Sequence, residues 1–116
     1  AFANQADKVG VPWDGTPEER RKIAADLDVA GLWAEANRRP IYLGEFGAYD
    51  KAEMSARARW TDAVARAAED RGFSWAYWQF TGDFVLYEMN KKQWVEPIRD
   101  ALVPPKRAGA RQSKAQ

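Results

Sequence analysis

Cysteine and histidine are both absent from this 116-residue sequence. The lack of cysteine excludes a disulfide framework and thiolate chemistry, and the lack of histidine excludes histidine-based general bases and catalytic triads. A structural zinc site is not expected without these ligands, and we expect no metal and no cofactor. Acid–base chemistry would have to use carboxylates, lysine or tyrosine.

Long apolar runs and a strong charge of one sign are also missing. No run reaches the roughly 18 to 20 apolar residues that span a bilayer, and residues 1–10 lack the features of a signal peptide. Lys and Arg number 18 against 17 Asp and Glu, a net charge of +1. We therefore expect no nucleic-acid and no membrane partner. Residues 105–116 carry basic side chains without apolar anchors and are expected to form a disordered tail.

The first helix is expected to begin after Thr16, which can cap it, with Pro17 at the first helical position. Glu19 lies three residues beyond the cap, where its side chain can complete a capping box. The helix should run to about Asn37, because Pro40 prevents its continuation. Four apolar residues recur at helical spacing, which predicts an inward face: Ile23, Leu27, Ala30 and Ala34.

A second helix is expected after Asp50 and Glu53, which repeat the capping pattern, and it should run to about Arg71. Its inward face is expected to carry Trp60, Val64 and Ala67 or Ala68. A short third helix is expected over residues 94–103, with Pro97 tolerated in its first turn. The tryptophans of the three helices are interpreted as core residues: Trp33, Trp60 and Trp94.

Two short apolar segments are typical of buried strands. Residues 41–46 lie between Pro40 and Gly47, and residues 73–80 are apolar and aromatic throughout, which favours parallel strands covered by helices. Residues 84–92 receive no assignment. Alternating helices and strands indicate a parallel α/β sheet, but two strands cannot complete one, and a closed eight-stranded barrel needs about 250 residues. The chain is therefore expected to be the end of a longer domain.

Glu45 is the first candidate for a functional residue, because it lies at the carboxyl end of the first expected strand between Gly44 and Gly47. Catalytic groups of α/β barrels lie at such strand ends. Alternation along the strand would place Ile41, Leu43 and Glu45 on the same side, so that Glu45 points into the mouth of a barrel. The alternative is a glutamate that ends the strand and makes only a structural hydrogen bond.

Trp78 is the second candidate, near the end of the next strand and on the same side as Ser74 and Ala76. Its indole could form the floor of a sugar subsite, because the apolar faces of pyranose rings stack on such planes. The alternative is a core tryptophan. Three aromatic residues of opposite parity are expected to pack under the helices: Phe73, Trp75 and Tyr77. Three residues of the following loop receive no individual role: Asp83, Tyr87 and Glu88.

Three segments together closely resemble the end of glycoside hydrolase family 5, the cellulase family. They are residues 39–49 with Gly-Glu-Phe-Gly at 44–47, residues 59–61 with Arg-Trp-Thr, and residues 72–80 with Trp-Ala-Tyr-Trp at 75–78. The resemblance extends from about Trp13 to Pro104. It implies an α/β fold, namely the C-terminal fragment of a (β/α)8 TIM barrel with its last two strands and three helices.

The resemblance implies that Glu45 is the catalytic nucleophile and that Trp78 lines the glucose subsite next to the cleaved bond. Retaining hydrolysis of this kind needs a second carboxyl group about 5 to 5.5 Å from the nucleophile. In the family that acid follows an asparagine, and no Asn-Glu dipeptide occurs in this chain. Residues 2–5 also depart from the family, with Phe-Ala-Asn-Gln where relatives often have Phe-Thr-His-Gln.

Two hypotheses follow. In the first, residues 1–104 are an incomplete part of the catalytic domain of an endo-β-1,4-glucanase. The complete enzyme would be secreted or periplasmic and would act on β-glucan polysaccharide or oligosaccharide, whereas the isolated chain would be inactive. In the second, the chain is a non-catalytic carbohydrate-binding or assembly piece that completes a barrel with another chain. Open sheet edges would then favour self-association. A nucleotide-binding domain is disfavoured, because no glycine-rich phosphate loop follows either strand.

Overall fold

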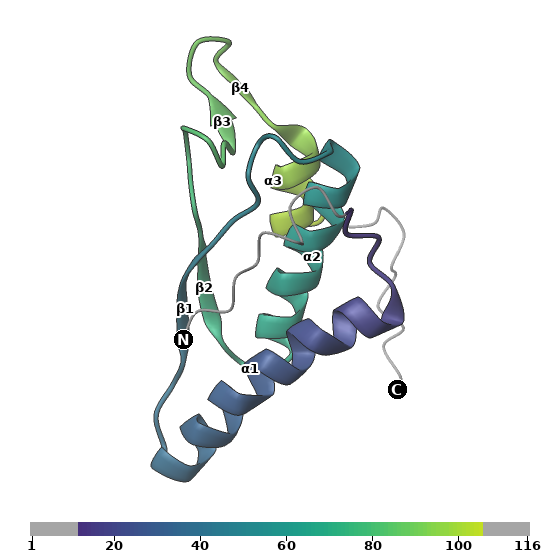
Figure 1. The fold of residues 1–116 in the computed structure, drawn as a ribbon. Helices are drawn as coiled ribbons and strands as arrows, with labels where there is room; N and C mark the ends of the chain where they lie inside the picture. Colours follow the sequence, from purple (N-terminus) through teal and green to yellow (C-terminus); the bar gives the residue numbers. More distant parts are fainter. Residues whose placement is uncertain (1–11, 106–116) are drawn as a thin grey trace, which may run out of the picture.

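The computed structural model describes residues 12–105. The expected basic tail, except for Pro105, and the departure from the family at residues 2–5 lie outside the described residues. The described residues form seven elements, which Figure 1 labels. They are α1 (Pro17–Asn37), β1 (Tyr42–Phe46), α2 (Met54–Glu69), β2 (Ser74–Tyr77), β3 (Tyr87–Glu88), β4 (Gln93–Trp94) and α3 (Glu96–Leu102). Strands β1 and β2 are parallel, as predicted, and β3 and β4 form an antiparallel hairpin.

Helix α1 begins and ends as the sequence predicts. Thr16 caps it through a complete capping box with Glu19, and Arg38 follows its end in the left-handed region, at φ 52°. The predicted apolar face is only half-buried, and no α1 residue is fully buried. The prediction that Trp33 is a core residue is wrong. It lies beside the inward face and is 54% exposed.

Helix α2 is capped by Glu53 and not by Asp50, so that part of the predicted start is wrong. The Glu53 carboxylate accepts hydrogen bonds from the backbone amides of Ser55 and Ala56, at 2.9 Å each. These amides belong to the first helical turn, which has no partners of its own within the helix. The predicted inward face is confirmed at Val64 and Ala68, which are buried.

The cap gives α2 a pH-dependent stability. Hydrogen bonds from the Ser55 side chain and from the Ser55 and Ala56 amides lower the pKa of Glu53 to about 2 from 4.5. The stabilisation by the charged cap is therefore complete above about pH 4.5 and is lost as the pH falls towards 2. We expect the unfolding free energy of Glu53→Gln to fall less steeply than that of the wild type in this range.

Thermal unfolding followed by circular dichroism at several pH values measures this difference. Glu35→Gln, which changes an exposed glutamate of α1, serves as the matched control and should keep the wild-type slope. Identical slopes for the wild type and Glu53→Gln would contradict the assignment of Glu53 as the cap.

A β-bulge interrupts the pairing of β1 with β2. Leu43 is opposite Trp75 and Phe46 is opposite Tyr77, so three steps along β1 match two along β2. The extra residue puts both Leu43 and Phe46 on the side that packs into the core, and it leaves Glu45 exposed. The prediction that Leu43 and Glu45 share a side is therefore wrong, because simple alternation fails across a bulge.

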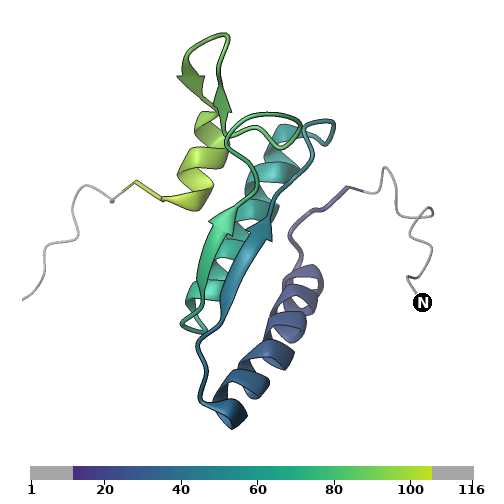
Figure 2. The ribbon, with the colours of Figure 1, turned by 90° about the vertical axis from the view of Figure 1, so that its left-hand side faces the viewer.

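The core lies between the sheet and helices α2 and α3 (Figure 2). It contains Phe46, Val64, Ala65, Ile98 and Leu102. The rings of Trp75 and Tyr77 pack edge-on against Phe46, each with its centroid at 5.6 Å, as their parity predicts. Aliphatic and aromatic burial of this kind supplies most of the stability of such a layer.

The structure differs from the sequence-based expectation at the β3–β4 hairpin and at the start of helix α3. The unassigned segment 84–92 contains β3, and its partner β4 contains Trp94, which was predicted to be a core residue of the last helix. That prediction is wrong, because helix α3 starts only at Glu96, with Pro97 in its first turn, and Trp94 is 43% exposed. The second predicted strand is also shorter than expected. After Trp78 the backbone amide of Gln79 donates to Phe84 in the following loop.

One face of the parallel sheet is uncovered. Figure 2 views this face, with α2 behind it. Tyr42 is 64% and Trp78 47% exposed there. The Cα radius of gyration is 16.6 Å, against about 13 Å for a compact domain of about this length. The described residues therefore form an open two-stranded parallel sheet that helices cover on one face only, with unpaired strand edges. Within residues 12–105, no helix is long and apolar enough to cross a membrane.

Candidate active site at the carboxyl ends of the parallel strands

Glu45 lies at the carboxyl end of β1, next to Phe46, which anchors the strand in the core. Its side chain is exposed, and none of the ion pairs among the described residues involves it. A carboxylate placed at a strand end, with no partner that neutralises it, can act on a ligand at the open face. This position is compatible with the predicted role of a nucleophile.

Trp78 is bonded to the end of the strand that carries Glu45. Its backbone amide donates a hydrogen bond to the carbonyl of Phe46 at 2.7 Å. A Cβ atom on Gly47 would lie 1.8 Å from the carbonyl oxygen of Trp78, so only glycine fits there. A cis peptide bond joins Trp78 to Gln79. The Gly-Glu-Phe-Gly segment at the end of β1 and Trp78 are more than 30 residues apart in the sequence and thus meet at one end of the sheet.

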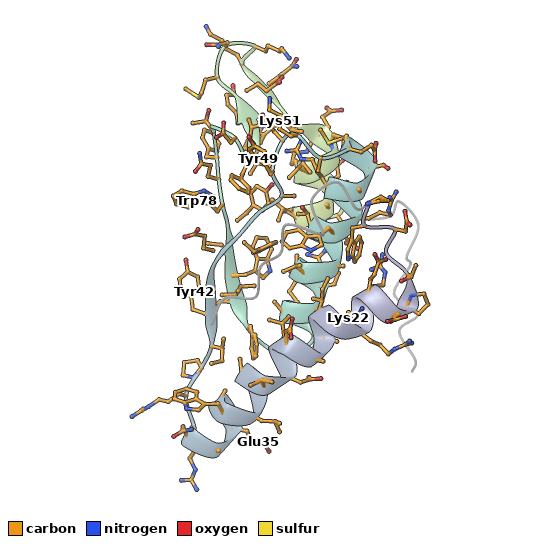
Figure 3. The ribbon with its side chains drawn as sticks, viewed as in Figure 1. Lys22, Glu35, Tyr42, Tyr49, Lys51 and Trp78 are labelled. Carbon is orange, nitrogen blue, oxygen red and sulfur yellow. The ribbon has the colours of Figure 1, made fainter. Side chains whose placement is uncertain are left out.

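The indole of Trp78 faces the open side of the sheet. Figure 3 shows Trp78 and Tyr42 projecting to the same side, away from the helices. Trp78 is 47% exposed, so the interpretation as a core tryptophan does not hold for the described residues. An exposed indole beside a free carboxylate offers an apolar plane for a sugar ring and a charged group for its anomeric centre.

The loops that follow the two strands hold each other in place. The backbone amide of Asp50 donates to the carbonyl of Asp83 at 2.7 Å, and the rings of Tyr49 and Phe84 lie 5.7 Å apart. Tyr87 of the hairpin instead stacks on Phe80 of the loop before it, with 5.2 Å between ring centroids. Glu88 accepts from Lys91 at 3.0 Å and from Gln93 at 3.1 Å, and the Lys91 hydrogen bond is the main cause that lowers its pKa.

One unusual residue was not singled out in the sequence. Arg57 of α2 is only 4% exposed, and its Nε and Nη2 have no hydrogen-bond partner among the described residues. The signal was present in the sequence, because Arg57 lies four residues before Thr61 and seven before Val64, on the face that α2 buries. A cation at a buried position of a helix is unusual, because arginine is almost never fully buried without a partner.

The described residues place one exposed carboxylate, Glu45, and one exposed aromatic plane, Trp78, at this end of the sheet. Within residues 12–105, no group of three acidic side chains is arranged to hold a metal ion. Retaining glycoside hydrolysis uses two carboxyl groups, one as nucleophile and one as acid. The arrangement around Glu45 and Trp78 therefore matches half of such a site.

Comparisons with known proteins agree with this description. No family model matches the chain. Endoglucanase H of Acetivibrio thermocellus is 28% identical over 97 residues, which are 78% of this chain and 11% of that protein. A solved hyperthermophilic endo-β-1,4-glucanase in complex with substrate is 45% identical, with TM-score 0.78, over 80% of this chain and 30% of that one.

Endoglucanase Cel5A of Thermotoga maritima is 37% identical, with TM-score 0.80, over 87% of this chain and 32% of that one. Structures of that enzyme with cellobiose and with mannotriose are also similar to this chain. The chain thus spans about a third of the length of these solved enzymes. The agreement covers both sequence and backbone, and we conclude that the chain is homologous to the endoglucanases of glycoside hydrolase family 5.

Proposed function

We propose that this chain carries the nucleophile, Glu45, and a sugar-stacking residue, Trp78, of an exported endo-β-1,4-glucanase. The observation that supports the proposal is their common placement, at the carboxyl ends of adjacent parallel strands and on the face that the helices leave open. In a closed α/β barrel this face becomes the interior, and its carboxyl end is where active sites lie.

The proposed reaction is a double displacement. The Glu45 carboxylate attacks the anomeric carbon, the glycosidic C–O bond breaks, and a second carboxyl group outside this chain protonates the leaving oxygen. Water, deprotonated by that second group, then releases the sugar from its ester with Glu45 and restores the anomeric configuration. Trp78 holds the sugar ring next to the cleaved bond by stacking on its apolar face.

The substrate class follows from the relatives. The homologous T. maritima enzyme binds cellobiose, and it also binds mannotriose. We therefore propose a β-1,4-linked glucan as substrate, with mannan as the second class to test. The chain alone should not turn over either substrate, because general acid catalysis contributes about 10² to 10⁴-fold and its acid lies elsewhere.

The experiment compares the chain alone with a completed barrel, made by fusing residues 12–105 behind the first two thirds of T. maritima Cel5A. We expect the fusion to hydrolyse a soluble aryl cellobioside and the chain alone to show no turnover. A folded but inactive fusion would contradict the assignment of the site. Turnover by the chain alone that disappears in Glu45→Gln would contradict its dependence on a second carboxyl group.

A second candidate function is a non-catalytic carbohydrate-binding or assembly piece, favoured by the uncovered face of the sheet and by the radius of gyration of 16.6 Å. Apolar surface of this kind promotes association. Native mass spectrometry of the chain distinguishes the possibilities. Defined oligomers that bind cellotetraose would support this function, whereas a compact, stable monomer would count against an incomplete barrel.

A further inference from the structure

Helix α1 contacts the rest of the chain through two neighbouring sides. Ile23 is half-buried and packs against the core. The next side faces α2 and the segment that follows it. There the Asp28 carboxylate pairs with Arg71 at 2.7 Å, and a Cβ atom on Gly31 would lie 3.7 Å from the ring of Phe73. These two sides of α1 are therefore occupied.

The free flank of α1 is formed by Val29 and Trp33, which lie one turn apart and share one surface. At about 3.6 residues per turn, each of them lies almost half a turn around the helix from Gly31, away from α2. Val29 is 71% and Trp33 54% exposed. Contiguous exposed apolar side chains of this size mark interaction surfaces.

The free edge of β1 lies on the same side of the chain as α1. Among residues 12–105, β1 pairs only with β2. Figure 2 shows α1 on the side of β1, and α3 and the hairpin on the side of β2. Parallel strands are joined by crossover helices, and α1, which leads into β1 through residues 38–41, has the position of such a helix. A single strand–helix unit could therefore cover both the free edge and the free flank.

The length of the homologous enzymes indicates where such a unit comes from. The chain spans 30% and 32% of two solved endoglucanases. In an α/β barrel the strands close into a ring, and each helix lies between two neighbours in the outer ring. Within the described part of the chain, α1 has such a neighbour only in α2. A complete barrel supplies the second neighbour.

We propose that a strand–helix unit of the complete barrel docks on this side of the chain. Its strand pairs with the free edge of β1, and the apolar face of its helix packs on Val29 and Trp33. Trp33 supplies most of the contact area, because an indole buries more surface than an aliphatic side chain. The proposal rests on the barrel that the proposed function also requires.

Leu32 separates the docking surface from the outer surface of α1. It is 68% exposed, almost as much as Val29, but at helical spacing it lies opposite Ile23 and so points away from the core. The outward side of a helix in the outer ring of a barrel stays in contact with solvent. We therefore expect docking to bury Val29 and Trp33 and to leave Leu32 exposed.

Apolar-to-aspartate substitutions test the proposal in the completed barrel, the fusion with T. maritima Cel5A. Val29→Asp should lower the midpoint of thermal unfolding by about 10 °C or more, because docking would bury an unpaired charge. Leu32→Asp is the matched control and should lower the midpoint by less than about 3 °C. In the full chain alone both substitutions should stay within about 3 °C of the wild type, because both side chains are exposed.

Fluorine nuclear magnetic resonance of protein labelled with fluorotryptophan provides a measurement that needs no destabilised variant. Trp33→Phe identifies the Trp33 signal, and exchange of light for heavy water shifts the signal of an exposed indole. We expect this solvent shift for Trp33 in the full chain and its loss in the completed barrel. The Trp78 signal should keep its solvent shift in both, because the cleft stays open.

A solvent-exposed Trp33 in an active barrel would overturn this proposal and leave the proposed function intact. A protected Trp33 in a folded but inactive barrel would support docking and contradict the proposed function. Equal losses of stability from Val29→Asp and Leu32→Asp would also refute the docking surface. Protection of Trp33 in the full chain alone that grows with concentration would assign the flank to a second copy, again against the proposal.

Discussion

Glu45→Gln in the completed barrel is expected to lower kcat for an aryl cellobioside by about 10⁴-fold or more. Loss of a covalent nucleophile removes the reaction path itself, and measured effects at such residues are of this size or larger. Glutamine keeps the shape of the side chain, and Glu45 is exposed, so stability should not change. Steady-state kinetics and thermal unfolding of the same preparations measure both quantities.

The control for this prediction is Asp83→Asn, which removes an exposed carboxylate from the loop after β2. Its kcat should stay within about tenfold of the wild type. A second test separates a nucleophile from an acid: azide added to Glu45→Ala should restore turnover and give an α-glycosyl azide, because it attacks from the face that Glu45 leaves. Wild-type kcat in Glu45→Gln, or a β-glycosyl azide, would refute the assignment.

Gly47→Ala is expected to destabilise the chain by about 3 kcal/mol or more, a size reached by severe overpacking. The added Cβ atom would lie 1.8 Å from the carbonyl oxygen of Trp78 and 2.9 Å from its carbonyl carbon. Both are backbone atoms, so relief requires the two strand ends to separate and the Phe46–Trp78 hydrogen bond to break. Urea unfolding of the two proteins measures the difference.

Gly44→Ala is the matched control, because Gly44 flanks Glu45 on the other side. Its Cβ atom would meet Cε1 of Tyr42 at 3.2 Å, and that ring is 64% exposed and can swing away. The cost should stay below about 1 kcal/mol. Equal losses at the two glycines would show that the contact with Trp78 does not determine the requirement at Gly47.

Sequence reasoning succeeded where a local pattern decides the structure. The capping box at Thr16 and Glu19 predicted the start of α1, and Pro97 predicted the first turn of α3. The two strands and their parallel pairing followed from short apolar runs separated by a helix. These features depend on neighbours within about one helical turn or one crossover, so a single sequence carries enough information.

Prediction from the sequence failed where contacts between distant segments determine the structure. Trp94 was placed in a helix because its spacing to Ile98 is helical, but pairing of β4 with β3 puts it in a hairpin. The contact between Gly47 and Trp78 and the burial of Arg57 also depend on elements far apart in the chain. In the candidate site, Glu45 and Trp78 were singled out by their places at expected strand ends, their proposed roles came from a family resemblance, and their exposure beside the open face came from the structure.

Because of the β-bulge between Leu43 and Phe46, the packing of β1 in the core and the direction of the side chain at position 45 depend on different features of the sequence. The hydrophobic anchors on either side set how the strand packs, whereas the number of residues between them sets the direction in which residue 45 points. Variation in residue type at this position can therefore be explored without repacking the core. Insertion or deletion of one residue between Leu43 and Phe46 would instead disturb the core, because it would turn the carboxylate towards α2 or displace Phe46 from beneath the sheet.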